Sequence, residues 1–375
     1  MSYAIPLSYN PIDTAALAEV LGRYEGKPHQ QIVSDFEAAL QQASGAPRVV
    51  AVSSGTAALH LALRLLDVGP GDTVMVSTFT YVASVAPVLY CGATPVFVDS
   101  EEDTWNMDPQ LLEQAIREQA QKGRVPKAIV VVHAYGMPAR LGDLLAVAAR
   151  WQIPLVEDAA EAYGSTYRGR WAGTLGDMGI YSFNNNKAVT TFGGGALLLR
   201  EGPWAARARL LASHAREDFP YYHHTEPGYN YAISPLAAAY GIGQVEQADG
   251  QVRLRREIFD HYIAELKEIP TLSWQKEEAG VTSSRWLTTV RLRGVSGRGI
   301  FEQLAGQSRY EIRRVWKPMH LQPVFAGARA YLSGTAEALF EGGLCLPSGM
   351  KTAAQAEEIA GWLLNGVFSV LNDQQ

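Results

Sequence analysis

Short β-rich runs alternate with helical patterns through the first two thirds of the chain, and this alternation restricts the possible folds more than any other feature. The runs comprise residues 74–76, 94–99, 128–133, 154–158, 178–183 and 195–199. Strands that alternate with helices in this way favour a largely parallel sheet covered by helices. We therefore predict an α/β fold.

A second, smaller part is expected at the C-terminal end. The 375 residues include 47% hydrophobic side chains, enough to fill more than one core. After Gly250 the pattern changes to a charged helix, a strand near 286–292 and further helices. We expect a large domain over residues 1–250 and a small α/β domain over 251–375, with the N-terminal segment as a candidate to pack on the small domain.

Charge and hydropathy argue against several classes of partner. The chain has 32 basic and 38 acidic residues, a net charge of −6, and no long basic run, so nucleic acid is not an expected partner. No apolar stretch is long enough to span a bilayer and the N-terminus lacks a signal pattern, so we expect a cytoplasmic protein. Cys91 and Cys345 each lie in apolar surroundings, which predicts neither a disulfide nor a metal site.

Lys187 and Asp158 are the pair that points to a chemistry. Asp158 ends the run 154–158, and Lys187 lies between the last two predicted strands. Open parallel sheets bind ligands beyond the carboxyl ends of their strands, where both residues fall. An amine that forms a Schiff base and a carboxylate that keeps a ring nitrogen protonated are what pyridoxal phosphate requires. Either residue alone is typical of a surface charge or a cap, so the prediction depends on both.

Two further segments fit the same cofactor. Ser53-Ser54-Gly55-Thr56 leads directly into a strong helix former, and a helix N-terminus offers free N–H groups and a positive dipole end to a phosphate. A serine-capped helix without a ligand is the alternative. Phe79 follows a strand and is a candidate to lie against a pyridine ring, with a buried core aromatic as the alternative.

The motifs resemble the sugar aminotransferases of the DegT/DnrJ/EryC1 family. The segments that carry the likeness are 54–59 (SGTAAL), 157–162 (EDAAEA), 182–187 (SFNNNK) and 193–195 (GGG). The likeness runs in the family's motif order from about Tyr24 to Gly349. It implies the fold type I pyridoxal-phosphate aminotransferase architecture, a homodimer with active sites at the subunit interface, and amino transfer to a keto group on a nucleotide-linked sugar.

The resemblance also implies which residues hold the cofactor. Gly55, Thr56 and Ser182 would bind its phosphate, while Phe79 and Ala160 would lie on either side of its ring. We expect no metal site, since His133 and the pair His223-His224 have no carboxylate or cysteine at metal-binding spacing.

Four other residues would have more specific roles in such an enzyme. Asp158 would pair with the ring nitrogen, and Lys187 would carry the cofactor and move protons. Glu161 would lie next to the ring oxygen or the substrate, and Asn230 would reach the phosphate in the neighbouring subunit. The sequence departs from the family pattern at residues 232–235 (AISP), which leaves the interface contacts there open, and at Asn185, which replaces a common glycine.

A narrower likeness concerns the sugar. Segments 103–107, 314–323 and 343–348 resemble the branch that aminates UDP-linked 4-keto-6-deoxy-N-acetylhexosamines on the route to bacillosamine-type sugars, with L-glutamate as the expected amino donor. Trp316, Lys317 and His320 would then stack on and neutralise the nucleotide diphosphate. A rigid proline-containing loop that only docks the small domain is the alternative for these three residues.

Other reactions remain as alternatives at this stage. They are 3-amination, dehydration, and amination of a GDP- or dTDP-linked keto sugar. A related sugar dehydratase carries histidine at the position of Lys187, which disfavours dehydration. A nicotinamide oxidoreductase needs a glycine-rich turn between strand and helix, but Gly193-Gly194-Gly195 precedes a predicted strand.

Overall fold

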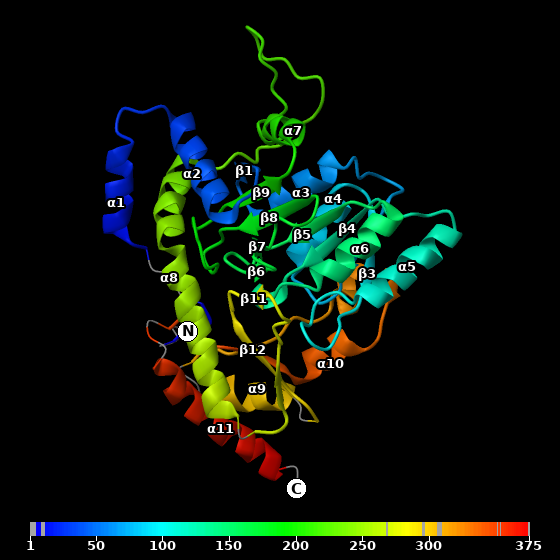
Figure 1. Ribbon diagram of the computed structural model, residues 1–375, viewed down its shortest axis with the longest axis vertical. Coiled ribbons are helices and arrows are strands. Elements are labelled where there is room, and N and C mark those ends of the chain that lie inside the picture. Colours follow the sequence, from blue (N-terminus) through cyan, green and yellow to red (C-terminus); the bar gives the residue numbers. More distant parts are fainter. Residues whose placement is uncertain are drawn as a thin grey trace.

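The computed structural model describes residues 5–8, 12–267, 269–294, 297–305, 310–350, 352 and 354–373. A large sheet with helices on both faces occupies one end of the molecule, and a smaller sheet with its own helices occupies the other (Figure 1). No helix within these ranges is both long enough and apolar enough to cross a membrane.

The large sheet has eight strands in the order β1-β9-β8-β5-β4-β2-β3-β14. The strands are β1 (Arg48–Val52), β2 (Thr73–Ser77), β3 (Thr94–Val98), β4 (Ala128–Val132), β5 (Leu155–Asp158), β8 (Met178–Ser182), β9 (Gly195–Leu199) and β14 (Ala330–Tyr331). Strand β9 runs antiparallel to its two neighbours, and every other pair is parallel. The predicted α/β fold with a mostly parallel sheet is therefore confirmed.

Helices cover both faces of this sheet because its strands carry apolar side chains on both faces. Val74 and Val76 pack with α3 (Gly55–Leu65) on one face, whereas Met75 packs with the helices of the other. The first face also carries α4 (Ala86–Tyr90) and α7 (Gly202–Ala212). The second face carries α2 (His29–Ser44), α5 (Pro109–Gln121), α6 (Leu141–Trp151) and the first half of α8, with α1 (Thr14–Arg23) packed outside α8.

Helix α8 (Pro235–Leu266) is the continuous link to the second part of the molecule. The domain boundary expected after Gly250 lies inside this helix. Beyond it, an antiparallel sheet has the order β10-β12-β15-β13. Its strands are β10 (Leu272–Trp274), β12 (Thr288–Leu292), β13 (Arg313–Arg314) and β15 (Gly343–Leu346), and the helices beside it are α9 (Gly297–Ala305), α10 (Thr335–Gly342) and α11 (Gln355–Asp373).

The two parts exchange segments at several places. Strand β14 lies far along the chain but extends the large sheet by pairing with β3, and β11 (Val281–Thr282) pairs with β6 (Thr166–Tyr167), which also pairs with β7 (Arg170–Trp171). At the other end of the chain, Ile5 bridges Tyr310 and packs in the core of the smaller part. These exchanges fix the two parts against each other around the carboxyl edge of the large sheet.

Asp99, at the end of β3, ties the large sheet to helix α10. Its buried carboxylate accepts hydrogen bonds from the backbone N–H groups of Ser100, Ser333, Gly334 and Ala336, at 2.7–2.9 Å. Three of these donors belong to the first turn of α10 or to the residues before it, so the side chain caps a helix that lies over 230 residues away in sequence.

We predict that Asp99→Ala lowers the free energy of unfolding by about 3 kcal/mol, because several buried N–H groups lose their acceptor. Asp108→Ala serves as the control, since Asp108 caps α5 from a half-buried position and its loss is expected to cost about 1 kcal/mol. Urea denaturation of both variants measures the difference, and equal losses would contradict a bridging role for Asp99.

Candidate active site

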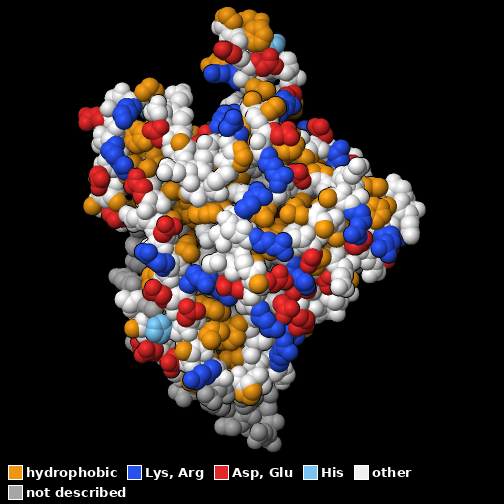
Figure 2. Space-filling model, viewed as in Figure 1, with side chains coloured by type: hydrophobic (Ala, Val, Ile, Leu, Met, Phe, Trp, Pro, Cys, Tyr) orange, Lys and Arg blue, Asp and Glu red, His pale blue; other side chains and the backbone are white. Residues whose placement is uncertain are grey.

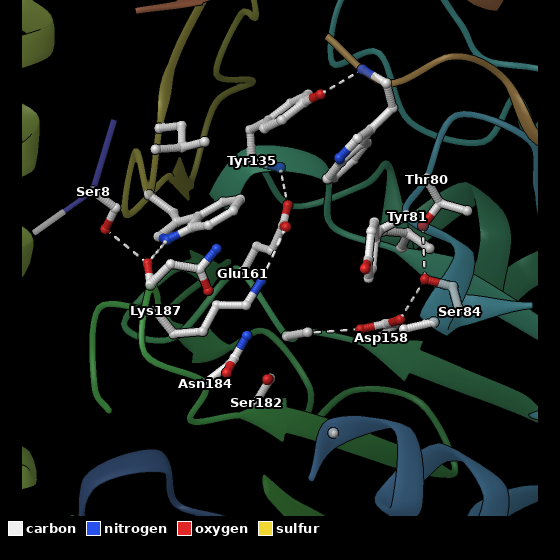
Figure 3. Close-up of a pocket in the computed structure, with 18 of the residues that line it drawn as sticks. Ser8, Thr80, Tyr81, Ser84, Tyr135, Asp158, Glu161, Ser182, Asn184 and Lys187 are labelled. Carbon is white, nitrogen blue, oxygen red and sulfur yellow. Dashed lines mark hydrogen bonds and ion pairs between the residues drawn. The ribbon is translucent and has the colours of Figure 1, made fainter. Parts of the chain in front are cut away.

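A cavity of about 810 Å³ opens at the carboxyl edge of the large sheet (Figure 3). Asp158 at the end of β5 and Ser182 at the end of β8 form part of its wall. Trp286 and Trp316 form another part of the wall and belong to the C-terminal region that contains the smaller sheet. The cavity is thus made by both parts of the molecule, and its size is within the range of small-molecule sites.

Lys187 points into this cavity from the connection between β8 and β9. Its Nζ donates a hydrogen bond to Glu161 Oε1 at 3.1 Å and lies 4.0 Å from the ring centroid of Trp286. The loop that carries it is held from outside, because the backbone oxygen of Asn186 accepts from Trp286 Nε1 and from Ser8 Oγ, each at 2.7 Å. The amine is therefore fixed in position by groups from three distant segments.

Glu161 is the acidic partner of this amine. Its second oxygen accepts from the backbone N–H of Tyr135 at 2.9 Å. Burial raises the pKa of Glu161 to about 7, although the charge of Lys187 acts in the opposite direction. A carboxyl group with this pKa exchanges its proton readily near neutral pH, within hydrogen-bonding distance of the lysine.

Asp158 is a second carboxylate in the lining of the cavity. Its Oδ2 accepts from Ser84 Oγ at 2.7 Å, and its Oδ1 accepts from the backbone N–H of Ala160 at 3.1 Å. Just before it in sequence, Glu157 is buried outside the cavity lining and binds His133 Nε2 at 2.9 Å. His133 thus has a structural partner, and the described residues contain no group of three side chains placed to hold a metal ion.

A cradle for an anion lies at the N-terminus of α3. Ser54 caps the helix by accepting from Ala57 N–H, and Gly55, Thr56 and Ser182 line the cavity beside it. A Cβ added to Gly55 would lie only 2.9 Å from the Cβ of Ser182. The absence of a side chain at Gly55 therefore keeps the free N–H groups of the helix accessible to a phosphate.

The structure places Tyr81 at the cavity, and not Phe79, which the sequence predicts to lie against the cofactor ring. Phe79 is 1% exposed and packs edge-to-face against Tyr135 and Trp316, outside the lining of the cavity. Tyr81 is 60% exposed and lines the cavity opposite Lys187 (Figure 3). The motif TFTY contains both rings, and only the conformation of the chain after β2 distinguishes them.

Of the three residues predicted to bind the nucleotide, the structure brings only Trp316 to the cavity. Its ring stacks on Tyr135 with centroids 4.1 Å apart, and its backbone N–H donates to the Tyr135 hydroxyl. Lys317 is not part of the lining. His320 is largely buried, bonded through Nδ1 to Thr78 and through Nε2 to Glu337 on α10, so it connects the two parts of the molecule, as the docking alternative requires.

Asn230 does not line the cavity of its own chain. It is exposed, and its backbone bridges Ser213 at the base of a long segment between α7 and α8. Several other residues that line the cavity give no local signal in the sequence, among them Thr80, Ser84, Tyr135, Trp286 and Arg313.

These groups fit pyridoxal phosphate. The cavity offers an amine to bind an aldehyde, a carboxylate to face a ring nitrogen, and a glycine-lined helix terminus for a phosphate. Gly55, Thr56 and Ser182 would hold the phosphate, while Tyr81 and Ala160 are placed to contact the ring. When bound, the cofactor supplies an electron sink for charge that develops at a substrate carbon.

Comparisons with known proteins agree with this geometry. Residues 13–362 match the model of the DegT/DnrJ/EryC1/StrS aminotransferase family. EpsN of Bacillus subtilis, assigned as a pyridoxal phosphate-dependent aminotransferase, is 44% identical over 86% of this chain and 84% of its own. The GDP-perosamine synthase of Caulobacter vibrioides is 36% identical over 85% of each chain.

A solved structure gives the same result. The pyridoxal-phosphate form of Spr1654 from Streptococcus pneumoniae, assigned as a sugar aminotransferase, superimposes with a TM-score of 0.88 at 28% identity and covers 98% of this chain and all of its own. The predicted aminotransferase architecture and cofactor are thereby confirmed. The chain belongs to the DegT/DnrJ/EryC1/StrS aminotransferase family and is a pyridoxal-phosphate-dependent sugar aminotransferase.

Proposed function

We propose that the enzyme transfers an amino group from L-glutamate to the 4-keto group of a UDP-linked 2-acetamido-4-keto-2,6-dideoxyhexose. The observation that supports this best is the position of Lys187, whose amine faces a cavity large enough for a cofactor and a sugar together. The likeness of segments 103–107, 314–323 and 343–348 to the bacillosamine-type branch supports the identity of the sugar.

Lys187 and Glu161 would share the proton transfers. With pyridoxal phosphate and substrate bound, the amine of Lys187 would serve as the base that takes a proton from the substrate carbon. Glu161 Oε1, 3.1 Å from Nζ, accepts or returns a proton as the charge on the lysine changes. The same two groups serve the reverse steps with the sugar ketone, so we expect ping-pong kinetics.

The far wall of the cavity suits a nucleotide-linked sugar. Trp286, Tyr135 and Trp316 present aromatic surface, against which the apolar faces of a hexose or a base can pack. Arg313 lines the cavity with a side chain two thirds exposed, where it could meet a diphosphate or a carboxylate of glutamate. The GDP-perosamine synthase relative favours a GDP-linked sugar as the second candidate.

We also propose a homodimer in which Asn230 contributes to the partner's site. The segment between α7 and α8 protrudes as an arm, and apolar side chains gather at its tip (Figures 1 and 2). Phe219, Tyr221 and Tyr222 in this arm are exposed. An apolar arm and an asparagine outside its own cavity are what a shared interface requires.

The identity of the reaction is tested by absorption spectroscopy of the purified enzyme. We expect a visible band from the lysine-bound cofactor that disappears with L-glutamate and returns with the UDP-linked 4-keto sugar. Lys187→Ala and Lys187→Arg should lose turnover at least about a thousandfold while remaining folded. Recovery of the band with a GDP-linked or 3-keto sugar, and not with the UDP-linked sugar, would reject the proposed substrate.

The pKa of Glu161 predicts the pH dependence. Above about pH 7 its carboxylate is ionised and can accept a proton from Lys187, and below that pH it is protonated and cannot. We therefore expect kcat/KM for glutamate to fall as the pH decreases through about 7. The Glu161→Gln variant should lack this acidic limb, and an unchanged profile in the variant would contradict the role of Glu161.

Hybrid dimers test the contribution of Asn230. Lys187→Ala and Asn230→Ala subunits, co-expressed with different tags and purified as hybrids, should regain about half the wild-type activity, because one of their two sites is intact. Each variant alone should have low activity. If Asn230 served its own subunit, the hybrids would be no more active than the average of the two parental dimers.

A further inference from the structure

Two hydroxyl groups form a chain that ends on Asp158 (Figure 3). Ser84 Oγ donates to Asp158 Oδ2 at 2.7 Å, and Thr80 Oγ1 lies 2.7 Å from Ser84 Oγ. A serine hydroxyl has a single proton, so Ser84 must accept in the second contact and Thr80 must donate. The hydrogen bonds therefore run in one direction, from Thr80 through Ser84 to the carboxylate.

The two hydroxyl groups are buried, and they come from a different part of the sequence than Asp158. Thr80 follows β2, and Ser84 ends the short helix η1 (Val82–Ser84); the two residues are 1% and 3% exposed. The other oxygen of Asp158 accepts from the backbone N–H of Ala160, within its own segment. The hydroxyl chain is thus the non-local support of the carboxylate, and it sets the direction in which Oδ2 points.

Asp158 shares its cavity with a second buried carboxyl group. The charge of Asp158 adds to the rise in the pKa of Glu161, after the larger effect of burial. Hydrogen bonds from hydroxyl groups to a carboxylate oxygen fix the direction in which its negative charge is presented. The charged groups that line the cavity are Asp158, Glu161, Lys187, Glu311, Arg313 and Arg314.

We propose that Ser84, supported by Thr80, is a positioning residue that keeps Asp158 Oδ2 directed at the ring nitrogen of bound pyridoxal phosphate. The proposal rests on the role of Asp158 towards the cofactor given above, and it is independent of which sugar is aminated. Ser84 does not need to touch the substrate. Its effect is exerted through Asp158, on how firmly the cofactor is retained and on the pH at which its spectrum changes.

Spectroscopic titration of the cofactor-loaded enzyme, without any substrate, tests this proposal. We expect Ser84→Ala to weaken cofactor retention about tenfold, as for the loss of one hydrogen bond to a charged acceptor, and to shift the midpoint of the spectral pH titration. Ser84→Thr, which keeps the hydroxyl, should restore both readouts. Ser77→Ala is the control, because Ser77 is buried on β2 but does not line the cavity.

A double-mutant cycle tests whether Thr80 acts on Asp158 through Ser84 or independently of it. Thr80→Val should weaken retention when Ser84 is present and have little further effect in the Ser84→Ala background, while Thr80→Ser should resemble the wild type. Additive losses would contradict the chain, as would a Ser84→Ala enzyme with an unchanged midpoint and retention.

A reference variant separates this proposal from the role of Asp158 itself. If Asp158→Asn alters the spectrum and Ser84→Ala does not, the positioning role of Ser84 is wrong while the proposed function stands. If Asp158→Asn also leaves the spectrum and retention unchanged, the role of Asp158 towards the cofactor is wrong, and the proposal for Ser84 is rejected with it.

Discussion

The hydrogen bond between Lys187 and Glu161 is the interaction around which the site is organised. It places an amine and a carboxyl group side by side in a desolvated cavity, with the pKa of the carboxyl near 7. Neither group could occupy this position alone without a large desolvation cost. The surrounding structure, from the Trp286 ring to the Tyr135 N–H, compensates for that cost and keeps both groups oriented.

The fold meets this requirement by dividing the task between its two parts. The parallel sheet positions the groups that follow its strands, which are the phosphate cradle, Asp158 and Lys187. The smaller part adds Trp286 and Trp316 as a wall over the amine, and the bonds from His320 to Thr78 and Glu337 hold the Trp316 loop against the end of β2. The cavity is thereby built from side chains of two different regions of the chain.

Much of this could be predicted from the sequence, because some of the signals are local. Asp158, Lys187 and Gly55 lie in short motifs that follow strands, and parallel strands bring such positions to one edge. Phe79 and Tyr81 lie in the same short motif, and a loop after a strand has no fixed periodicity that indicates which ring faces the cavity. The contact of His320 with Thr78 joins residues 242 positions apart, and that of Trp286 with Asn186 joins residues 100 positions apart, so no local pattern encodes them.

Strand β14 has a consequence for the order in which the protein is assembled. During synthesis the edge strand β3 leaves the ribosome more than 200 residues before Ala330–Tyr331, so its free N–H and C=O groups have no partner for most of translation. An open, apolar strand edge is prone to pair with other chains. Truncation ahead of residue 330 would remove the strand that pairs with β3 and leave this edge of the large sheet uncovered.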